Sequence, residues 1–163
     1  SQASQYYSEA CRLCGNCQRL EKLGPDAWRL DHAEMAGRLR ACAGKRSVKA
    51  VLLDQTVVAG IGNIYADEAC FASGIRPSRI LSSLPGHRVA ALARAIDEVL
   101  EKGVRNAGTS FRDFVGADGE SGANQEDLKV YGRAGQPCDI CDRPLRGAVV
   151  AQRTTVWCSR CQT

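Results

Sequence analysis

Apolar residues recur at helical spacing along the first half of the chain. Residues at about 32–43 follow this period and predict a first helix. A second, short helix, "VKAVLLDQ", is expected directly after Ser47, a residue type that often caps a helix N-terminus. The helical pattern is then interrupted at Gly60, resumes near Asn63 and ends around Gly74. The pattern therefore predicts three consecutive helices with a glycine-containing break before the third.

The second half of the chain changes character. The stretch "LPGHRVAALARAIDEVLEKGV" predicts a further amphipathic helix that ends at Gly103. The segment after it is rich in Gly, Asn, Asp and Ser and is typical of a loop. Beyond it, "AVVAQ" and "TTVW" predict two short β-strands. We expect a mainly α protein with a Cys-rich segment at 1–22, a helical domain at 23–128 and a small β-hairpin domain at 129–163.

Composition narrows the class of protein. A chain of 163 residues suffices for one domain or two small ones. No apolar run approaches the roughly 18 residues of a membrane-spanning helix, and no secretory signal is recognisable, so we expect a cytoplasmic protein. The net charge of +4 is mild. Arg and Lys gather at about 37–49, 76–94 and 129–160, which is compatible with a nucleic-acid-binding face but does not require one.

Nine cysteines form the strongest chemical signal. Four of them follow the pattern Cys138-x2-Cys141-x16-Cys158-x2-Cys161, in which the intervening residues suffice for a hairpin that brings the two pairs together. Four thiolates indicate a closed structural zinc site, because a catalytic zinc keeps one position open. Two disulfides or a redox pair are the alternatives. We also expect folding of this segment to depend on the metal.

Four arginines fall inside the same segment. They either form a solvated surface or contact phosphate, and a zinc-stabilised hairpin would hold their guanidinium groups in place. The four are Arg143, Arg146, Arg153 and Arg160.

The glycine break in the helical pattern has two interpretations. Gly60 and Gly62 permit positive φ angles and close approach of a ligand, and a helix that restarts near Asn63 leaves its first backbone amides unpaired. Those amides and the helix dipole favour an anion such as phosphate. Alternatively, the glycines allow two helices to pack closely. A dinucleotide-binding motif is excluded, because no strand precedes the break and no third glycine follows it.

Two long stretches resemble a known family. "VKAVLLDQTVVAGIGNIYADEACFASGIRPSR" and "LKVYGRAGQPCDICDRPLRGAVVAQRTTVWCSRCQ" are similar to the C-terminal half of the formamidopyrimidine-DNA glycosylase / endonuclease VIII family, whose members excise oxidised bases and cut DNA at the abasic site. The resemblance runs from about Leu23 to Gln162. It implies a helix-two-turn-helix domain followed by a zinc finger, which together bind damaged duplex DNA.

The resemblance also implies roles for individual residues. Asn63 matches the family asparagine that contacts a phosphate beside the damaged nucleotide, and Arg153 matches the zinc-finger arginine that contacts it from the other side. Lys49, Gly60 and Gly62 match the DNA-facing segment of the family. The implied location is the cytoplasm, in association with the nucleoid.

The chain departs from the family pattern in two ways. Asp142 and Gln152 stand where the family usually has glycine. The family nucleophile is an N-terminal proline followed by glutamate on a separate domain, whereas this chain begins "SQASQYY". We therefore assign no catalytic residue and expect no base excision by this chain alone. It is either part of a longer glycosylase or a stand-alone, non-enzymatic nucleic-acid-binding protein, for example a ribosome-associated one.

Three further cysteines lie outside the resemblance. Cys11, Cys14 and Cys17 are spaced by two residues, and Cys42 could supply a fourth thiol from the first helix. This spacing occurs in iron–sulfur ligation, and a second zinc is the nearer alternative. Ordinary thiols near a chain end are an equally acceptable interpretation.

Overall fold

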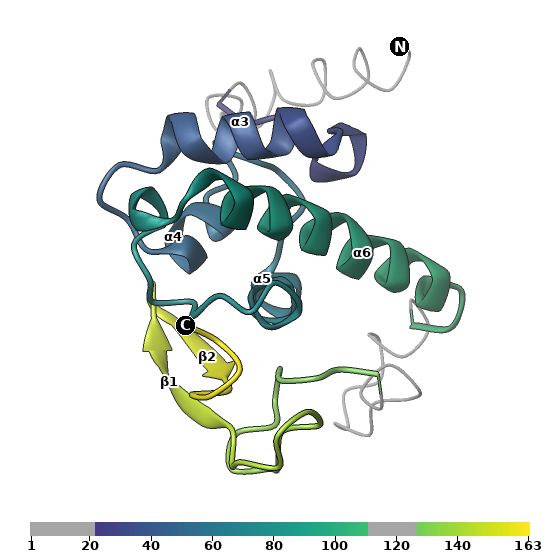
Figure 1. Cartoon of the computed structure of the whole chain (residues 1–163). Helices are drawn as coiled ribbons and strands as arrows, with labels where there is room; N and C mark the ends of the chain where they lie inside the picture. The colour runs from purple at the N-terminus through teal and green to yellow at the C-terminus, as the bar shows by residue number, and fades with distance from the viewer. Residues whose placement is uncertain (1–21, 111–126) are drawn as a thin grey trace.

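The computed structural model describes residues 22–110 and 127–163 of the chain. Within them, four α-helices precede a two-stranded antiparallel hairpin, so the expected mainly α fold is confirmed (Figure 1). No helix in the described ranges combines the length and apolar character needed to cross a membrane. The elements are η1 (Ala27–Arg29), α3 (His32–Cys42), α4 (Val48–Leu53), α5 (Asn63–Ala72), η2 (Leu81–Ser83), α6 (Gly86–Ser110), β1 (Arg146–Val150) and β2 (Arg153–Trp157).

Local capping sets the starts of the first two helices. Asp31 accepts a hydrogen bond from the Glu34 amide, and the Glu34 carboxylate accepts one from the Asp31 amide, which is a complete capping box. The Ser47 hydroxyl accepts a bond from the Ala50 amide, 3.2 Å away, as its position predicts. Helix α4 ends at Leu53, earlier than "VKAVLLDQ" suggests.

The turn between α4 and α5 has its own hydrogen bonds. The Gln55 side chain accepts from the Gly60 amide at 2.9 Å and donates to the Ile61 carbonyl at 3.0 Å. In this turn, bonds from the Gln55 side chain take the place of helical backbone bonds. The break between the two helices therefore begins after Leu53, several residues before Gly60.

Helix α6 does not end at Gly103, contrary to the prediction, but continues to Ser110. A Cβ atom at Gly103 would lie 2.3 Å from the hydroxyl oxygen of Tyr65. The glycine is therefore required by the aromatic side chain that packs against it and not by a helix terminus.

The helical region has one apolar core. Helices α3 and α5 pack against α6, which crosses the molecule as its longest element (Figure 1). The side chains at the centre of this core are fully buried, among them Leu39, Val51, Leu52, Leu92 and Ile96.

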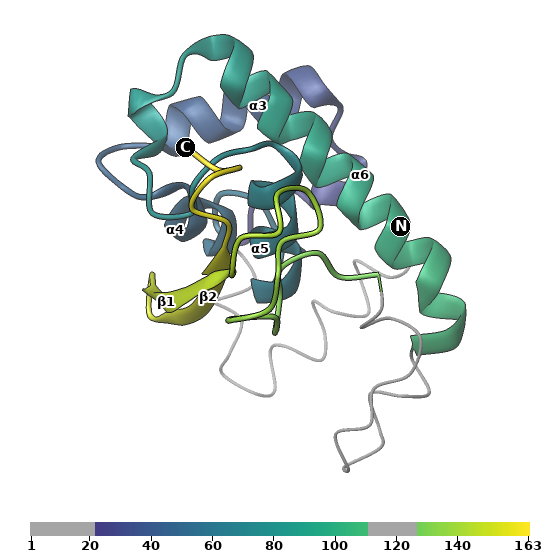
Figure 2. The same cartoon turned by 60° about the horizontal axis from the view of Figure 1, so that its bottom comes forward.

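The hairpin forms a second, smaller unit that lies beside α5 (Figure 2). Arg146 pairs with Trp157 and Val150 pairs with Arg153 at the two ends of the ladder. The two linking residues, Ala151 and Gln152, have φ angles of 52° and 64°. Positive φ at both central positions is typical of the tight turn whose twist matches that of a hairpin.

Candidate zinc site and nucleic-acid interface

The four C-terminal cysteines converge. The Sγ atoms of Cys138 and Cys161 are 3.9 Å apart, those of Cys141 and Cys158 are 3.5 Å apart, and all four lie within 4.8 Å of one another. A tetrahedral zinc with Zn–S bonds of about 2.3 Å holds its sulfurs about 3.8 Å apart, so the cluster fits this ion. A disulfide requires sulfurs about 2.05 Å apart, which excludes that alternative here. Because all four positions are thiols, no position remains for a reacting water.

The backbone around the second cysteine pair favours one thiolate. Burial acts to raise the pKa of Cys158, but the amides of Cys161 and Arg160 outweigh it and lower this pKa to about 7. The Cys161 amide lies 3.4 Å from the Cys158 sulfur. Burial and the neighbouring thiols raise the pKa of Cys161 to about 12. The backbone amides thus favour the thiolate form of Cys158, the form that binds a metal ion.

The second metal site gains no support. Cys11, Cys14 and Cys17 lie outside the described residues. Cys42 is half-buried at the end of α3 and packs against the helical core. Among residues 22–110 and 127–163, no other group of three or more potential metal ligands comes together.

The N-terminus of α5 presents unpaired backbone donors. Gly62 is its N-cap and has no side chain that could accept a hydrogen bond. The helical ladder begins with the bond from the Ala66 amide to the Gly62 carbonyl, 2.9 Å long. Within the described part of the chain, the amides of residues 63–65 therefore have no acceptor. Such donors at the positive end of a helix dipole favour an anion, as the sequence predicts.

The two glycines before α5 differ. Gly60 has a φ angle of 97°, which favours glycine strongly. Gly62 has φ −93° and ψ −178°, which is extended backbone open to any residue. Of the two glycines, only Gly60 uses the positive φ that glycine permits. A Cβ atom there would meet nothing within 4 Å, so the space in front of the helix terminus is open.

Asn63, one of the two predicted phosphate contacts, bonds to the residue that follows the other, Arg153. The Nδ2 atom of Asn63 donates to the carbonyl oxygen of Thr154 at 3.1 Å. Thr154 follows Arg153 in β2, and the Arg153 side chain is exposed. The Oδ1 atom of Asn63 is buried and has no hydrogen-bond partner within the described residues. The helix terminus and the hairpin thus form one continuous candidate site.

Lys49, which the family resemblance places on the DNA-facing segment, is fully buried. Its ammonium donates to Asp67 Oδ1 at 2.6 Å, to the Thr155 hydroxyl at 2.6 Å and to the Thr154 carbonyl at 2.9 Å. These three bonds use every donor of a lysine. Burial lowers the pKa of Lys49 and raises the pKa of Asp67, and each charge partly offsets the shift of the other. Lys49 connects α4, α5 and β2 inside the protein.

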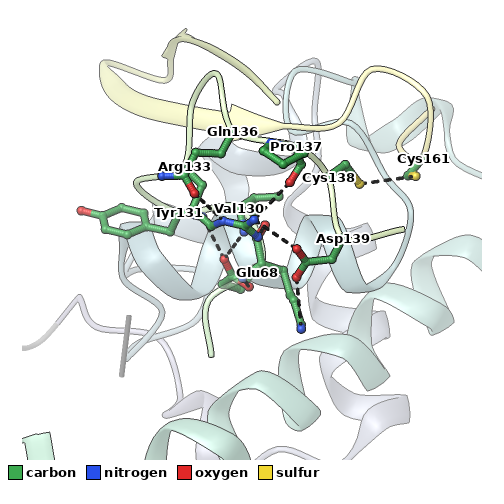
Figure 3. A network of polar contacts seen from close by, with 10 residues as sticks. Glu68, Val130, Tyr131, Arg133, Gln136, Pro137, Cys138, Asp139 and Cys161 are labelled. Atoms are coloured by element: carbon green, nitrogen blue, oxygen red, sulfur yellow. Dashed lines mark hydrogen bonds and ion pairs between the residues drawn. The ribbon is translucent and has the colours of Figure 1, made fainter. Parts of the chain in front are cut away.

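Glu68 attaches the chain that leads into the zinc finger. Its Oε1 atom accepts from the amides of Val130 and Tyr131, and its Oε2 atom accepts from the amide of Lys129, each at 2.9 Å (Figure 3). Neither Glu68 nor the preceding Asp67 is among the residues predicted to be functional from the sequence. A signal was present, because two carboxylates inside a largely apolar helix require partners if the helix is buried.

Gln162 makes a further attachment at the other end of α5. It is fully buried, accepts from the Cys158 amide at 2.7 Å and donates to the Ile75 carbonyl at 2.9 Å. The Thr163 amide donates to the Gly74 carbonyl at 3.0 Å. The zinc-binding segment is therefore hydrogen-bonded to the helical region near both ends of α5.

The arginines of the zinc-binding segment remain available for a ligand. All four side chains are exposed, and within the described residues none makes a hydrogen bond or ion pair with its guanidinium group. They are Arg143, Arg146, Arg153 and Arg160.

Two protein families match this chain. The Formamidopyrimidine-DNA glycosylase H2TH domain matches residues 23–115, and the zinc finger found in FPG and IleRS matches residues 135–163. The chain belongs to the family of the formamidopyrimidine-DNA glycosylase H2TH domain. The prediction of one structural zinc is confirmed by the second match together with the cysteine cluster.

Individual relatives agree with this classification. The Formamidopyrimidine-DNA glycosylase of Desulfitobacterium hafniense is 49% identical over 145 residues, which are 88% of this chain and 52% of that protein. The relative with the same name in Moorella thermoacetica is 54% identical over 128 residues, 77% of this chain and 46% of that protein. This chain spans about half the length of the curated relatives it matches.

Solved structures show the same fold. The crystal structure of the MutM (Fpg) protein from Thermus thermophilus superposes with a TM-score of 0.74 at 40% identity, over 88% of this chain and 55% of that one. The Lactococcus lactis formamidopyrimidine-DNA glycosylase, crystallised non-covalently bound to DNA containing an AP site, also has a TM-score of 0.74, at 32% identity, over 88% of this chain and 52% of that one.

Proposed function

We propose that this chain is the DNA-binding part of a base-excision-repair DNA glycosylase/AP lyase for oxidised bases. The helix-two-turn-helix region, 23–128, and the zinc finger, 129–163, together bind the phosphates of damaged duplex DNA in the cytoplasm, at the nucleoid. The observation that carries the proposal is the hydrogen bond from the Asn63 side-chain amide to the Thr154 carbonyl, which joins the start of α5 to the strand that carries Arg153. The helix start offers free backbone amides, and the Arg153 side chain is exposed on the neighbouring strand.

Each donor suits a phosphate oxygen. A helix N-terminus supplies backbone N–H groups and the positive end of a dipole, and an arginine supplies a bidentate cation. Contacts to phosphates carry no information about the base sequence. Binding should therefore depend little on DNA sequence and strongly on salt concentration. The relative from Lactococcus lactis supports this ligand class, because it was crystallised with DNA that contains an AP site.

The binding part of the proposal is tested by fluorescence anisotropy with two duplexes, one undamaged and one with an abasic-site analogue. We expect Asn63→Ala and Arg153→Ala each to weaken binding to both duplexes, and Arg153→Ala to reduce the slope of log K against log[salt] by about 1. Arg94→Ala, which removes an exposed arginine of α6, is the matched control. Normal binding by both site variants would refute the site, and no binding by the wild type would refute the function.

The enzymatic part of the proposal is tested separately. Borohydride reduction traps the Schiff base between an amine of the enzyme and the sugar of abasic DNA. We expect a covalent adduct from the natural protein to which this chain belongs. Absence of an adduct from that protein would leave a DNA-binding protein without lyase activity.

A further inference from the structure

The buried ammonium of Lys49 has acceptors on two parts of the molecule. Asp67 belongs to α5, whereas Thr154 and Thr155 belong to β2 of the zinc-binding segment. The lysine itself lies on α4. A charge in the interior is tolerated only when it is paired and fully hydrogen-bonded, and this one satisfies both conditions. The arrangement therefore fixes three elements relative to one another.

Two of these bonds act on the backbone beside Arg153. The Thr155 hydroxyl accepts from Lys49 and donates its own proton to the carbonyl oxygen of Arg153 at 2.9 Å. The carbonyl of the next residue, Thr154, accepts from Lys49 at 2.9 Å and from Asn63 at 3.1 Å. Lys49 thus bonds directly to the Thr154 carbonyl and, through the Thr155 hydroxyl, to the Arg153 carbonyl.

Asp67 completes the arrangement from α5. Its Oδ2 atom accepts from the Val156 amide at 3.1 Å, while its Oδ1 atom accepts from Lys49. Residues 153–156 of β2 are therefore bonded directly or through one hydroxyl to the Lys49–Asp67 pair. No apolar contact would fix the strand with the same directional precision, because hydrogen bonds depend steeply on angle.

We propose that Lys49 is a positioning residue for phosphate binding. It does not touch DNA; it holds β2 against the start of α5 so that Asn63 and Arg153 keep a fixed separation. This inference rests on the proposed function, since it assigns those two residues to phosphates. It differs from the role implied by the family resemblance, which places Lys49 on the DNA-facing segment.

The test compares the salt dependence of duplex binding among zinc-loaded, folded variants. Lys49→Met combined with Asp67→Asn removes both buried charges and leaves an acceptor for the Val156 amide. We expect about tenfold weaker binding and a slope of log K against log[salt] reduced by about 1, as for Arg153→Ala. Lys102→Met, which removes an exposed lysine on α6, is the control for losing a lysine outside the site and should keep the wild-type slope.

Adding Arg153→Ala to the Lys49→Met/Asp67→Asn variant separates positioning from general destabilisation. If Lys49 positions Arg153, the added substitution changes the slope little, because that contact is already lost. The inference would be overturned if Arg153→Ala lowered the salt slope of the Lys49→Met/Asp67→Asn variant as much as it lowers that of the wild type. A wild-type slope in the Lys49→Met/Asp67→Asn variant would also overturn it. Failure of the wild type to bind duplex would instead refute the proposed function.

A second variant covers the case in which the first does not fold. Thr155→Val keeps the shape of a fully buried side chain and removes only the hydroxyl between Lys49 and the Arg153 carbonyl. We expect a smaller loss of the same kind, about threefold weaker binding with a reduced salt slope. Wild-type affinity and slope in folded, zinc-loaded Thr155→Val would contradict a relay to Arg153.

Discussion

The helical region and the zinc-binding segment hold their shapes by different means. Among the described residues, the helical core contains 22 buried apolar side chains, whereas the cluster of the zinc-binding segment contains six, of which two are cysteines and one, Phe71, comes from α5. The first region is thus stabilised by apolar burial. We expect the second to depend on its metal and on its contacts with α5.

The boundary between the two regions is polar and directional. Lys49, Glu68 and Gln162 each make buried hydrogen bonds across it. Apolar burial stabilises contact without fixing orientation, since it scales with area, but hydrogen bonds require particular geometry. A boundary of this kind would keep the two proposed phosphate contacts at a set distance.

Removing zinc should have the largest effect and separate the two regions. Chelation withdraws a stabilisation of about 10–16 kcal/mol, judging from isolated zinc-finger peptides. We expect hydrogen exchange to show lost protection in residues 135–163, while α3 and the first turns of α6 remain protected. Simultaneous loss of protection in α3 would mean that the regions unfold as one unit.

A cavity in the helical core tests the other region. Leu39 is fully buried, and Leu39→Ala should lower the free energy of unfolding by about 3 kcal/mol, as measured by urea denaturation. Bound zinc should stay at the wild-type level in the folded protein. The control is Leu23→Ala, at a side chain that is 45% exposed, with an expected change within about 0.5 kcal/mol. Equal effects of both substitutions would contradict the assigned core.

Glu68→Gln tests the boundary. The amide keeps one oxygen for three backbone N–H groups, so at least one amide loses a charge-assisted bond at a cost of about 2 kcal/mol. We expect a lower thermal midpoint and faster hydrogen exchange at residues 129–131. Glu98→Gln, on the exposed surface of α6, should change neither quantity. Unchanged exchange at 129–131 in Glu68→Gln would mean that the carboxylate does not hold this segment.

Two glycine substitutions in helices should differ in sign. Gly103→Ala forces the Tyr65 ring to move and should lower the free energy of unfolding by about 1–2 kcal/mol. Gly37→Ala, in α3 with nothing within 4 Å of the added Cβ, should raise it by about 0.5–1 kcal/mol. Chemical denaturation measures both. A stabilising Gly103→Ala would show that this contact does not restrict the position.

The smallest effect is expected in the hairpin turn. Gln152 has a φ angle of 64°, where a side chain is strained, so Gln152→Gly should raise the thermal midpoint by an amount equivalent to less than about 1 kcal/mol. Ala148→Gly in β1 should lower the midpoint instead, because its backbone is extended and gains nothing from glycine. Gains from both substitutions would point to a general effect of glycine in the hairpin.

Asp142 and Gln152 connect sequence and structure. Both depart from the glycine usual in the family, and both have positive φ angles, 59° and 64°. The positive φ angles give a physical reason for the glycine that the family usually has at these two positions.

The sequence by itself determined the features that depend on near neighbours. The cap at Ser47, the four-cysteine pattern and the requirement for glycine at position 60 each reflect a residue and those a few positions away. These local signals were sufficient for the fold class and for the zinc site, whereas anion binding at the start of α5 stays a prediction.

Only the tertiary structure decided the burial of Lys49 and the continuation of α6 past Gly103. A lysine read from sequence is expected at the surface, because burying a charge is costly without partners. Its partners at Thr154 and Thr155 are 105 and 106 residues away, so no local pattern could reveal them. The sequence predicted a helix end at Gly103, because the Tyr65 ring that requires a glycine there belongs to another helix. Contacts between residues far apart in the sequence determine both features, because these contacts decide which side chains are buried away from water.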